Sequence, residues 1–118
     1  MSVNPVDVTA TYYAAWKAKD YDTLRSVLAD DIEFTGPFGN ASGGDDLREK
    51  IEKAPGSFTD IVIRKVFSDG PDVVTWFEMH TSFAPPVQVA AWSHVVDGKI
   101  TRHQAALDPR ALLGLGQE

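Results

Sequence analysis

The residues best suited to chemistry in this chain are two histidines, a glutamate and a tyrosine. Glu78 and His80 stand two residues apart in the run DVVTWFEMHTSF, while His103 and Tyr12 lie far away in the sequence. A neutral imidazole can move protons near neutral pH, and a carboxylate beside it would orient the ring and raise its pKa. If the run is a strand, Trp76, Glu78 and His80 share one face. The question is whether that face lines a pocket.

The composition excludes several classes of function. The 118-residue chain has 11 basic and 17 acidic residues, a net charge of −6 and no cysteine. Thiol catalysis, disulfides and cysteine-bound zinc are therefore excluded, and the scattered basic residues argue against a nucleic-acid partner. The dispersed histidines and the absence of a glycine-rich phosphate loop predict no metal and no cofactor. Without a signal peptide or a membrane-spanning apolar run, we expect one cytoplasmic domain over residues 1–118 with no membrane partner.

Local patterns place these residues on a series of helices followed by strands. Apolar spacing and capping residues predict helices over 5–18, from Asp22 onward and over 45–54. Alternation and turn signals predict strands over 31–39, 58–67, 72–83, 87–96 and 99–107, with NASGG as a loop. A last short helix is expected to begin at Asp108, in DPRALLGLG. This order predicts an α+β domain with helices gathered on one face of an antiparallel sheet.

The order of elements and three local motifs resemble a known family. The matching stretches are YYAAWKAKDYDTLRSVLADDIEFTGPFG, then GG-DDLREKI, then VVDGKITRHQAALDPRALLGLG. Together they resemble the SnoaL-like branch of the nuclear-transport-factor-2-like (NTF2-like) superfamily, over essentially the whole chain. The resemblance implies a cone-shaped fold in which a curved antiparallel sheet wraps around a long N-terminal helix, with three helices on the concave side. It also implies a deep cavity and a homodimer formed through the convex face.

The resemblance implies which face of each strand lines the cavity. The catalytic set would be Glu78, His80, His103 and Tyr12. The rest of the expected pocket comprises Trp16, Phe34, Trp76, Val89, Ala91, Ser93, Ala105 and Leu107. The expected convex side comprises Phe77, Met79, Trp92 and His94, whose apolar members would form the dimer patch.

Two catalytic patterns of the family are poorly matched. The family's isomerases carry a tyrosine on the first helix, an aspartate base near the first strand and an acid on the penultimate strand. Tyr12 fits the first position, but Gly36 and Ser93 stand at the other two. The epoxide hydrolases of the family need an Arg-x-Asp triplet, which the chain lacks.

Two other patterns of the family stay open. Its dehydratases use facing histidines with a tyrosine, which His80, His103 and Tyr12 could supply. Its polyketide cyclases use an aspartate near the end of the last strand with a histidine on the preceding strand, comparable to Asp108 and His94. Asp108 also suits a simple N-cap, and Glu78 and His80 could merely satisfy each other.

Two functional hypotheses follow. The first is a cofactor-independent isomerase, dehydratase or cyclase that acts on a small apolar or polycyclic molecule. In this hypothesis His80 and His103 move the proton, Glu78 orients one of them, and Tyr12 donates to a developing oxyanion. The second is a non-catalytic module that binds a small ligand or only dimerises. Convergence of Glu78, His80 and His103 on one empty volume would favour the first.

Overall fold

The computed structural model describes residues 4–36, 39–53, 58–82 and 84–108. Helices and strands follow in the order α1 (Pro5–Ala18), α2 (Tyr21–Ser26), β1 (Leu28–Gly36), β2 (Gly39–Ser42), α3 (Gly44–Lys53), β3 (Phe58–Asp69), β4 (Asp72–Thr81), β5 (Val87–Val96) and β6 (Lys99–Leu107). The six strands form one curved sheet in the order β2-β1-β6-β5-β4-β3. The predicted α+β architecture with a long N-terminal helix is therefore confirmed. The expected helix from Asp108 lies mostly outside the described residues.

The helices begin and end where the sequence provides caps. The Asn4 side chain accepts a hydrogen bond from the backbone N–H of Val6, and Pro5 occupies the first turn of α1. The helix ends at Lys19, whose left-handed backbone (φ 59°) turns the chain sharply. Asp20 then caps α2 by accepting from the backbone N–H of Thr23. Two consecutive caps thus place α1 and α2 at an angle to each other.

The sheet differs from the prediction in two respects. NASGG was expected to be a loop, but Gly39–Ser42 form β2, which pairs with the end of β1 as an edge strand. The sheet was expected to be antiparallel, but β1 runs parallel to β6 while the other pairs are antiparallel. The parallel pair arises because β6, the last strand, returns to lie beside β1. Local patterns do not encode such a long-range pairing.

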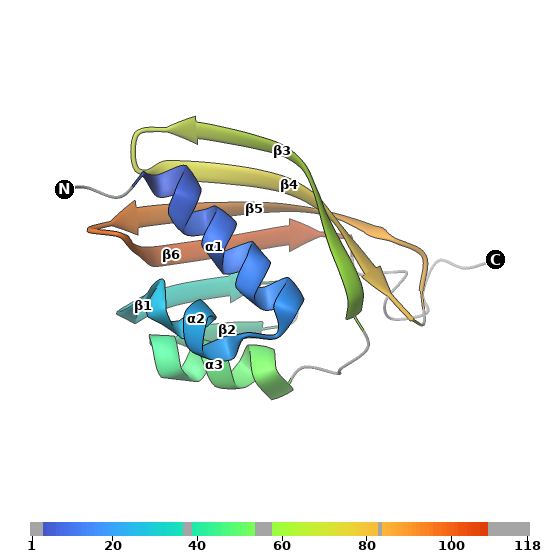
Figure 1. Ribbon diagram of the computed structural model, residues 1–118, viewed down its shortest axis with the longest axis horizontal. Helices are drawn as coiled ribbons and strands as arrows, with labels where there is room; N and C mark the ends of the chain where they lie inside the picture. Colours follow the sequence, from blue (N-terminus) through green and yellow to red (C-terminus); the bar gives the residue numbers. More distant parts are fainter. Residues whose placement is uncertain (1–3, 37–38, 54–57, 83, 109–118) are drawn as a thin grey trace.

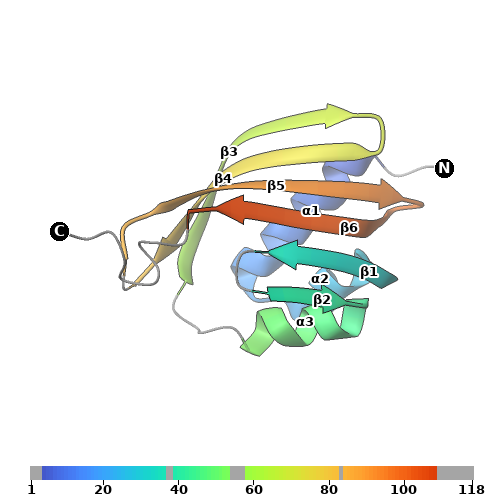
Figure 2. The same cartoon turned by 180° about the vertical axis from the view of Figure 1, so that it is seen from behind.

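All of the described helices lie on one side of the sheet or along its edge (Figure 1). Helix α1 crosses the concave face and contacts strands β3 to β6, while α3 packs on β1 and β2. Seen from behind, the outer face of the sheet carries no described helix (Figure 2). The buried core accordingly lies between α1 and the concave face, and includes Leu24, Leu28, Ile32 and Ile100. No helix in the described part of the chain is long and apolar enough to cross a membrane.

Irregularities in the strand pairing decide which side chains share the concave face. In β3, Ile63 pairs with Phe77 but Lys65 pairs with Trp76, so a bulge at Arg64 exchanges the two faces of β3. In β6, a second register shift lets Ile100 and His103 both turn inward, although they are three residues apart. These shifts bend the sheet and set the surface that α1 faces.

Candidate functional site

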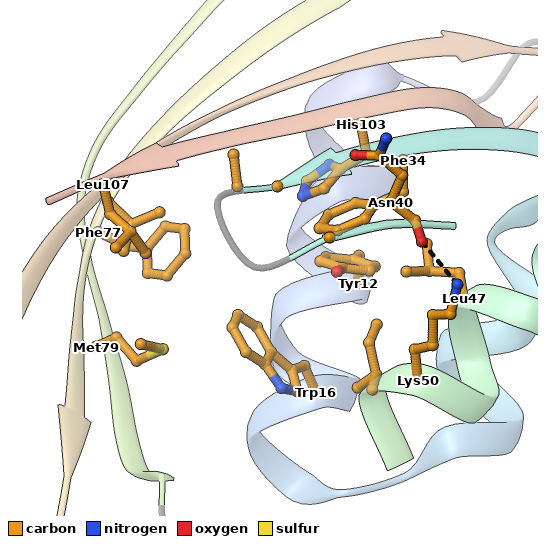
Figure 3. A pocket seen from close by; sticks show the side chains of 15 residues that line it. Tyr12, Trp16, Phe34, Asn40, Leu47, Lys50, Phe77, Met79, His103 and Leu107 are labelled. Atoms are coloured by element: carbon orange, nitrogen blue, oxygen red, sulfur yellow. Dashed lines mark hydrogen bonds between the residues drawn. The ribbon is translucent and has the colours of Figure 1, made fainter. Parts of the chain in front are cut away.

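A cavity of about 590 Å³ lies between α1, α3 and the concave face of the sheet. Its volume is in the range of small-molecule sites. The walls are mostly apolar and come from every layer of the fold (Figure 3): Tyr12, Trp16, Phe34, Gly36, Gly39, Asn40, Leu47, Lys50, Ile51, Phe77, Met79, Val89, His103, Ala105 and Leu107. No aspartate or glutamate is among these described lining residues. The cavity therefore suits a largely apolar molecule.

His103 is the central polar group of the cavity wall. Its side chain is buried, and its Nδ1 lies 2.7 Å from the Ser93 hydroxyl oxygen on the neighbouring strand. The ring stacks on Phe34, with centroids 5.7 Å apart and planes inclined by 15°. Burial lowers the pKa of His103 to about 4, because the imidazolium form loses its hydration. His103 is therefore neutral at pH 7, and either ring nitrogen could carry the single proton.

Tyr12 lies beside His103 in the same wall. The two rings are 5.0 Å apart between centroids, and Tyr12 is nearly fully buried. Burial raises the pKa of the Tyr12 hydroxyl above its ordinary value, so the group keeps its proton. Tyr12 is thus a neutral donor next to a neutral imidazole.

Asn40 and Lys50 are two further polar residues of the lining. The Lys50 ammonium donates to the backbone oxygen of Asn40 at 2.7 Å and to Asp46 at 3.1 Å. Lys50 is therefore held at the rim by α3 and β2 and is neutralised there. Among the described residues, no group of three or more histidine, aspartate or glutamate side chains is placed to hold a metal ion.

The predicted face of β4 is wrong. Phe77 and Met79 line the cavity, whereas Trp76, Glu78 and His80 lie on the outer face. Glu78 there accepts from Gln88 at 3.0 Å, lies 2.7 Å from the His80 ring and pairs with Arg64 at 3.3 Å. These contacts lower the pKa of Glu78, the bond from Gln88 most of all. Glu78 and His80 cannot act on a molecule in the cavity.

The error has a simple physical origin. The prediction assumed that a pocket needs the polar face of the strand, but this cavity is walled by apolar side chains. Phe77 pairs with Val89 and is 2% exposed, whereas Trp76 pairs with Ala90 and is 40% exposed. The signal that could have corrected the prediction was the ordinary rule that the more apolar face of a strand packs inward.

The remaining residues predicted to line the pocket divide into two groups. Tyr12, Trp16, Phe34, Val89, His103, Ala105 and Leu107 line the cavity as expected. Ala91 and Ser93 share that face but are buried behind the lining, where Ser93 contacts His103. The sequence interpretation did not assign Gly36, Gly39, Asn40, Leu47, Lys50 and Ile51 to the pocket, although Leu47 and Ile51 were recognisable as inward positions of the α3 helix.

The alternative pair of Asp108 and His94 is not brought together. His94 turns to the outer face, where its Nδ1 lies 2.7 Å from Asp72, and it pairs with Arg102. Asp108 is exposed and follows Leu107, which pairs with Val89 at the other end of the hairpin. Five residues of strand separate His94 from Val89, the partner of Leu107, which is about 16 Å. The predicted placement of His94 on the convex side is correct, but its partner is Asp72.

The curved sheet, the crossing helix α1 and the apolar cavity between them are the features expected of the cone-shaped NTF2-like fold. The family model described as the SnoaL-like domain matches residues 9–103. The chain belongs to this SnoaL-like family, as the resemblance predicted. Among functionally curated proteins, no sequence matches the chain.

Solved structures support the same fold at low sequence identity. An NTF2-like protein of unknown function from Cytophaga hutchinsonii aligns with a TM-score of 0.84 and 21% identity over 96% of this chain and 97% of its own. An epoxide hydrolase from M. tuberculosis aligns at 0.79 with 20% identity, covering 93% and 86%. TerC, co-crystallised with polyporic acid, aligns at 0.83 with 18% identity, covering 94% and 96%. These likenesses concern the fold alone.

Proposed function

We propose that the protein binds one small, largely apolar molecule in the cavity between α1 and the sheet. The observation that carries this proposal is the cavity of about 590 Å³, with apolar walls and a small polar group formed by His103 and Tyr12. Such a distribution favours burial of a hydrophobic body while a few polar contacts orient it. The structure of TerC with polyporic acid supports a small-molecule role for this fold.

A second candidate is a cofactor-independent isomerase or lyase that uses the same cavity. The His103–Tyr12 pair favours it, because two neutral polar groups could stabilise charge that develops on a bound oxygen. The acid–base set of Glu78 and His80 is not part of this candidate, since both lie on the outer face. Without a carboxylate base among the described lining residues, ligand binding is the function that the cavity supports best.

Two neighbouring alanines of β6 allow a direct test of ligand binding. Ala105 lines the cavity, whereas Ala106 is exposed on the opposite face. A tryptophan at 105 would fill the cavity, and the same change at 106 would not. In equilibrium dialysis with the neutral tricyclic probe 9-fluorenone, we expect Ala105→Trp to lower affinity at least about tenfold, which corresponds to about 1.4 kcal/mol. Ala106→Trp should bind as the wild type does.

Circular dichroism would first establish that both tryptophan variants are folded. Unchanged binding by a folded Ala105→Trp variant would place the probe outside the cavity and contradict the proposal. Failure of the wild type to bind 9-fluorenone and the two related tricycles, fluorene and carbazole, would also contradict it.

We further propose that the chain forms a homodimer through the outer face of the sheet. The reason given from sequence fails for Phe77 and Met79, which lie inside the cone, but Trp92 is on the outer face. An apolar patch is nevertheless present there: Phe67 pairs with Val74 and Val74 with Trp92, while Trp76 lies on the same face. Phe67 is 62% exposed and Trp76 is 40% exposed. Contiguous exposed apolar surface of this kind favours association.

Substituting a charge into this patch should produce a monomer. We expect wild-type protein to sediment as a dimer and Trp76→Glu to sediment as a monomer, because a carboxylate at the centre of an apolar interface is costly to bury. Ile63→Glu is the matched control, since Ile63 is similarly exposed (42%) but pairs with Phe77 on the other face. A monomeric wild type at high micromolar concentration, or equal effects of the two changes, would argue against this interface.

A further inference from the structure

The contact between Ser93 and His103 restricts which nitrogen of the imidazole carries the proton. Ser93 Oγ and His103 Nδ1 are 2.7 Å apart. Both residues are buried, and Ser93 is only 1% exposed. Among the described residues, no second hydrogen bond reaches either side chain. One proton must therefore lie between these two atoms. It comes either from the serine hydroxyl or from Nδ1.

The two arrangements differ in the group that they leave without a partner. If Nδ1–H donates to Ser93, the serine O–H is a buried donor with no acceptor among the described residues. If Ser93 donates to Nδ1, its proton is used, and the remaining His103 proton is on Nε2, in a ring that lines the cavity. A buried donor without a partner costs more than a donor that a cavity ligand or water can reach. The second arrangement is therefore favoured.

We infer that Ser93 is a positioning residue that holds His103 as the Nε2–H tautomer, so that the cavity offers its ligand a hydrogen-bond donor rather than a base. Tyr12 adds a second donor, because its hydroxyl is protonated and its ring lies 5.0 Å from that of His103. Two neighbouring neutral donors suit a carbonyl-type oxygen on the ligand. This inference rests on the proposed function and narrows its ligand class to apolar molecules that carry such an acceptor.

The tautomer can be measured without any ligand. In NMR spectra of the wild type near pH 7, protonated and unprotonated imidazole nitrogens have well-separated chemical shifts. We expect an unprotonated Nδ1 and a protonated Nε2 for His103, with its signals assigned by their loss in His103→Gln. Ser93→Ala removes the donor to Nδ1, and we expect it to shift the Nδ1 signal and to admit the other tautomer. A protonated Nδ1 in the wild type would overturn the inference.

Ligand selection gives a second, independent readout. 9-Fluorenone, fluorene and carbazole share one tricyclic shape, but they present an acceptor oxygen, no polar group and an N–H donor, respectively. We expect wild-type protein to bind 9-fluorenone at least about tenfold more tightly than carbazole, since each donor left without an acceptor loses about this factor. Ser93→Ala should bring this ratio towards one. Tyr12→Phe should weaken binding of 9-fluorenone while leaving that of fluorene unchanged.

The outcomes separate this inference from the proposed function. Binding of all three tricycles in the cavity with equal affinity would overturn the donor inference and leave ligand binding intact. A preference for carbazole that persists in Tyr12→Phe, where the tyrosine hydroxyl can no longer accept the carbazole N–H, would show that Nε2 is an acceptor and would overturn the donor inference as well. Binding of none of them would contradict the proposed function itself, while the NMR measurement would still decide the tautomer.

Discussion

Replacing Phe77 by alanine should lower the free energy of unfolding by about 3–5 kcal/mol, the range typical of a large aromatic side chain deleted from a core. Phe77 is 2% exposed and packs on two aromatic rings of α1, Tyr13 at 5.0 Å and Trp16 at 6.0 Å between centroids. Its loss removes contacts between the sheet and α1 and enlarges the cavity. Urea unfolding followed by circular dichroism measures the difference.

The neighbouring Trp76 is the matched control for this prediction. Trp76 lies on the outer face of the same strand with 40% exposure, so Trp76→Ala should cost the monomer about 1 kcal/mol or less. Both variants should be compared at a concentration where the chain is monomeric, because Trp76 also belongs to the proposed interface. If Phe77→Ala does not fold, Phe77→Leu should still lose about 1 kcal/mol. A larger loss from Trp76→Ala than from Phe77→Ala would mean that the strand faces are reversed.

Acidification should destabilise the protein through His103. The pKa of this imidazole is about 4 in the folded chain against 6.5 for the unperturbed group. Between these values the unfolded chain binds a proton that the folded chain does not, so stability falls as pH decreases. The contribution is fully present above pH 6.5 and is lost as pH falls towards 4. The expected loss is about 3 kcal/mol.

A variant without this titration isolates the effect. In His103→Gln all carboxylates and the other two histidines remain, so their pH dependence cancels when the two proteins are compared. Urea unfolding from pH 7.5 to pH 4 should show the wild type losing about 3 kcal/mol more than the variant. Parallel curves for the two proteins would show that His103 titrates at its ordinary pKa and is not buried as described.

Much of the fold was predictable because its signals are local. Pro5 at the start of α1 and the Asp97-Gly98 turn between β5 and β6 each act over a few residues. The second helix was expected from Asp22, and the structure places its cap two residues earlier, at Asp20. The positive φ angles of Asp97 (52°) and Gly98 (76°) are those of a tight hairpin turn, which the Asp-Gly pair favours. Capping and turn interactions of this kind form between neighbouring residues, so they depend little on the rest of the tertiary structure.

The pairing partners of the strands were less predictable because they depend on distant residues. Gly39–Ser42 are a strand only because β1 supplies the hydrogen bonds, and β1 is parallel to β6 because β6 returns across the whole domain. Likewise, the bulge at Arg64 moves Phe67 to the outer face, where it extends the apolar patch. Residue propensities along the sequence do not specify which strands pair or where a bulge shifts their register.

The sequence by itself determined the class of protein and half of the cavity wall. Helical spacing places Tyr12 and Trp16, one turn apart, on the same face of α1. Strand alternation likewise places His103, Ala105 and Leu107 on one face of β6, independent of which strand pairs with it. The tertiary structure alone decided the chemistry. In the folded chain Glu78 and His80 lie on the outer face of the sheet. Ser93 on β5 contacts His103 on the neighbouring strand β6. The physical reason is that period-two alternation assigns residues to faces without saying which face is inside, and a hydrogen bond between strands exists only once their register is formed.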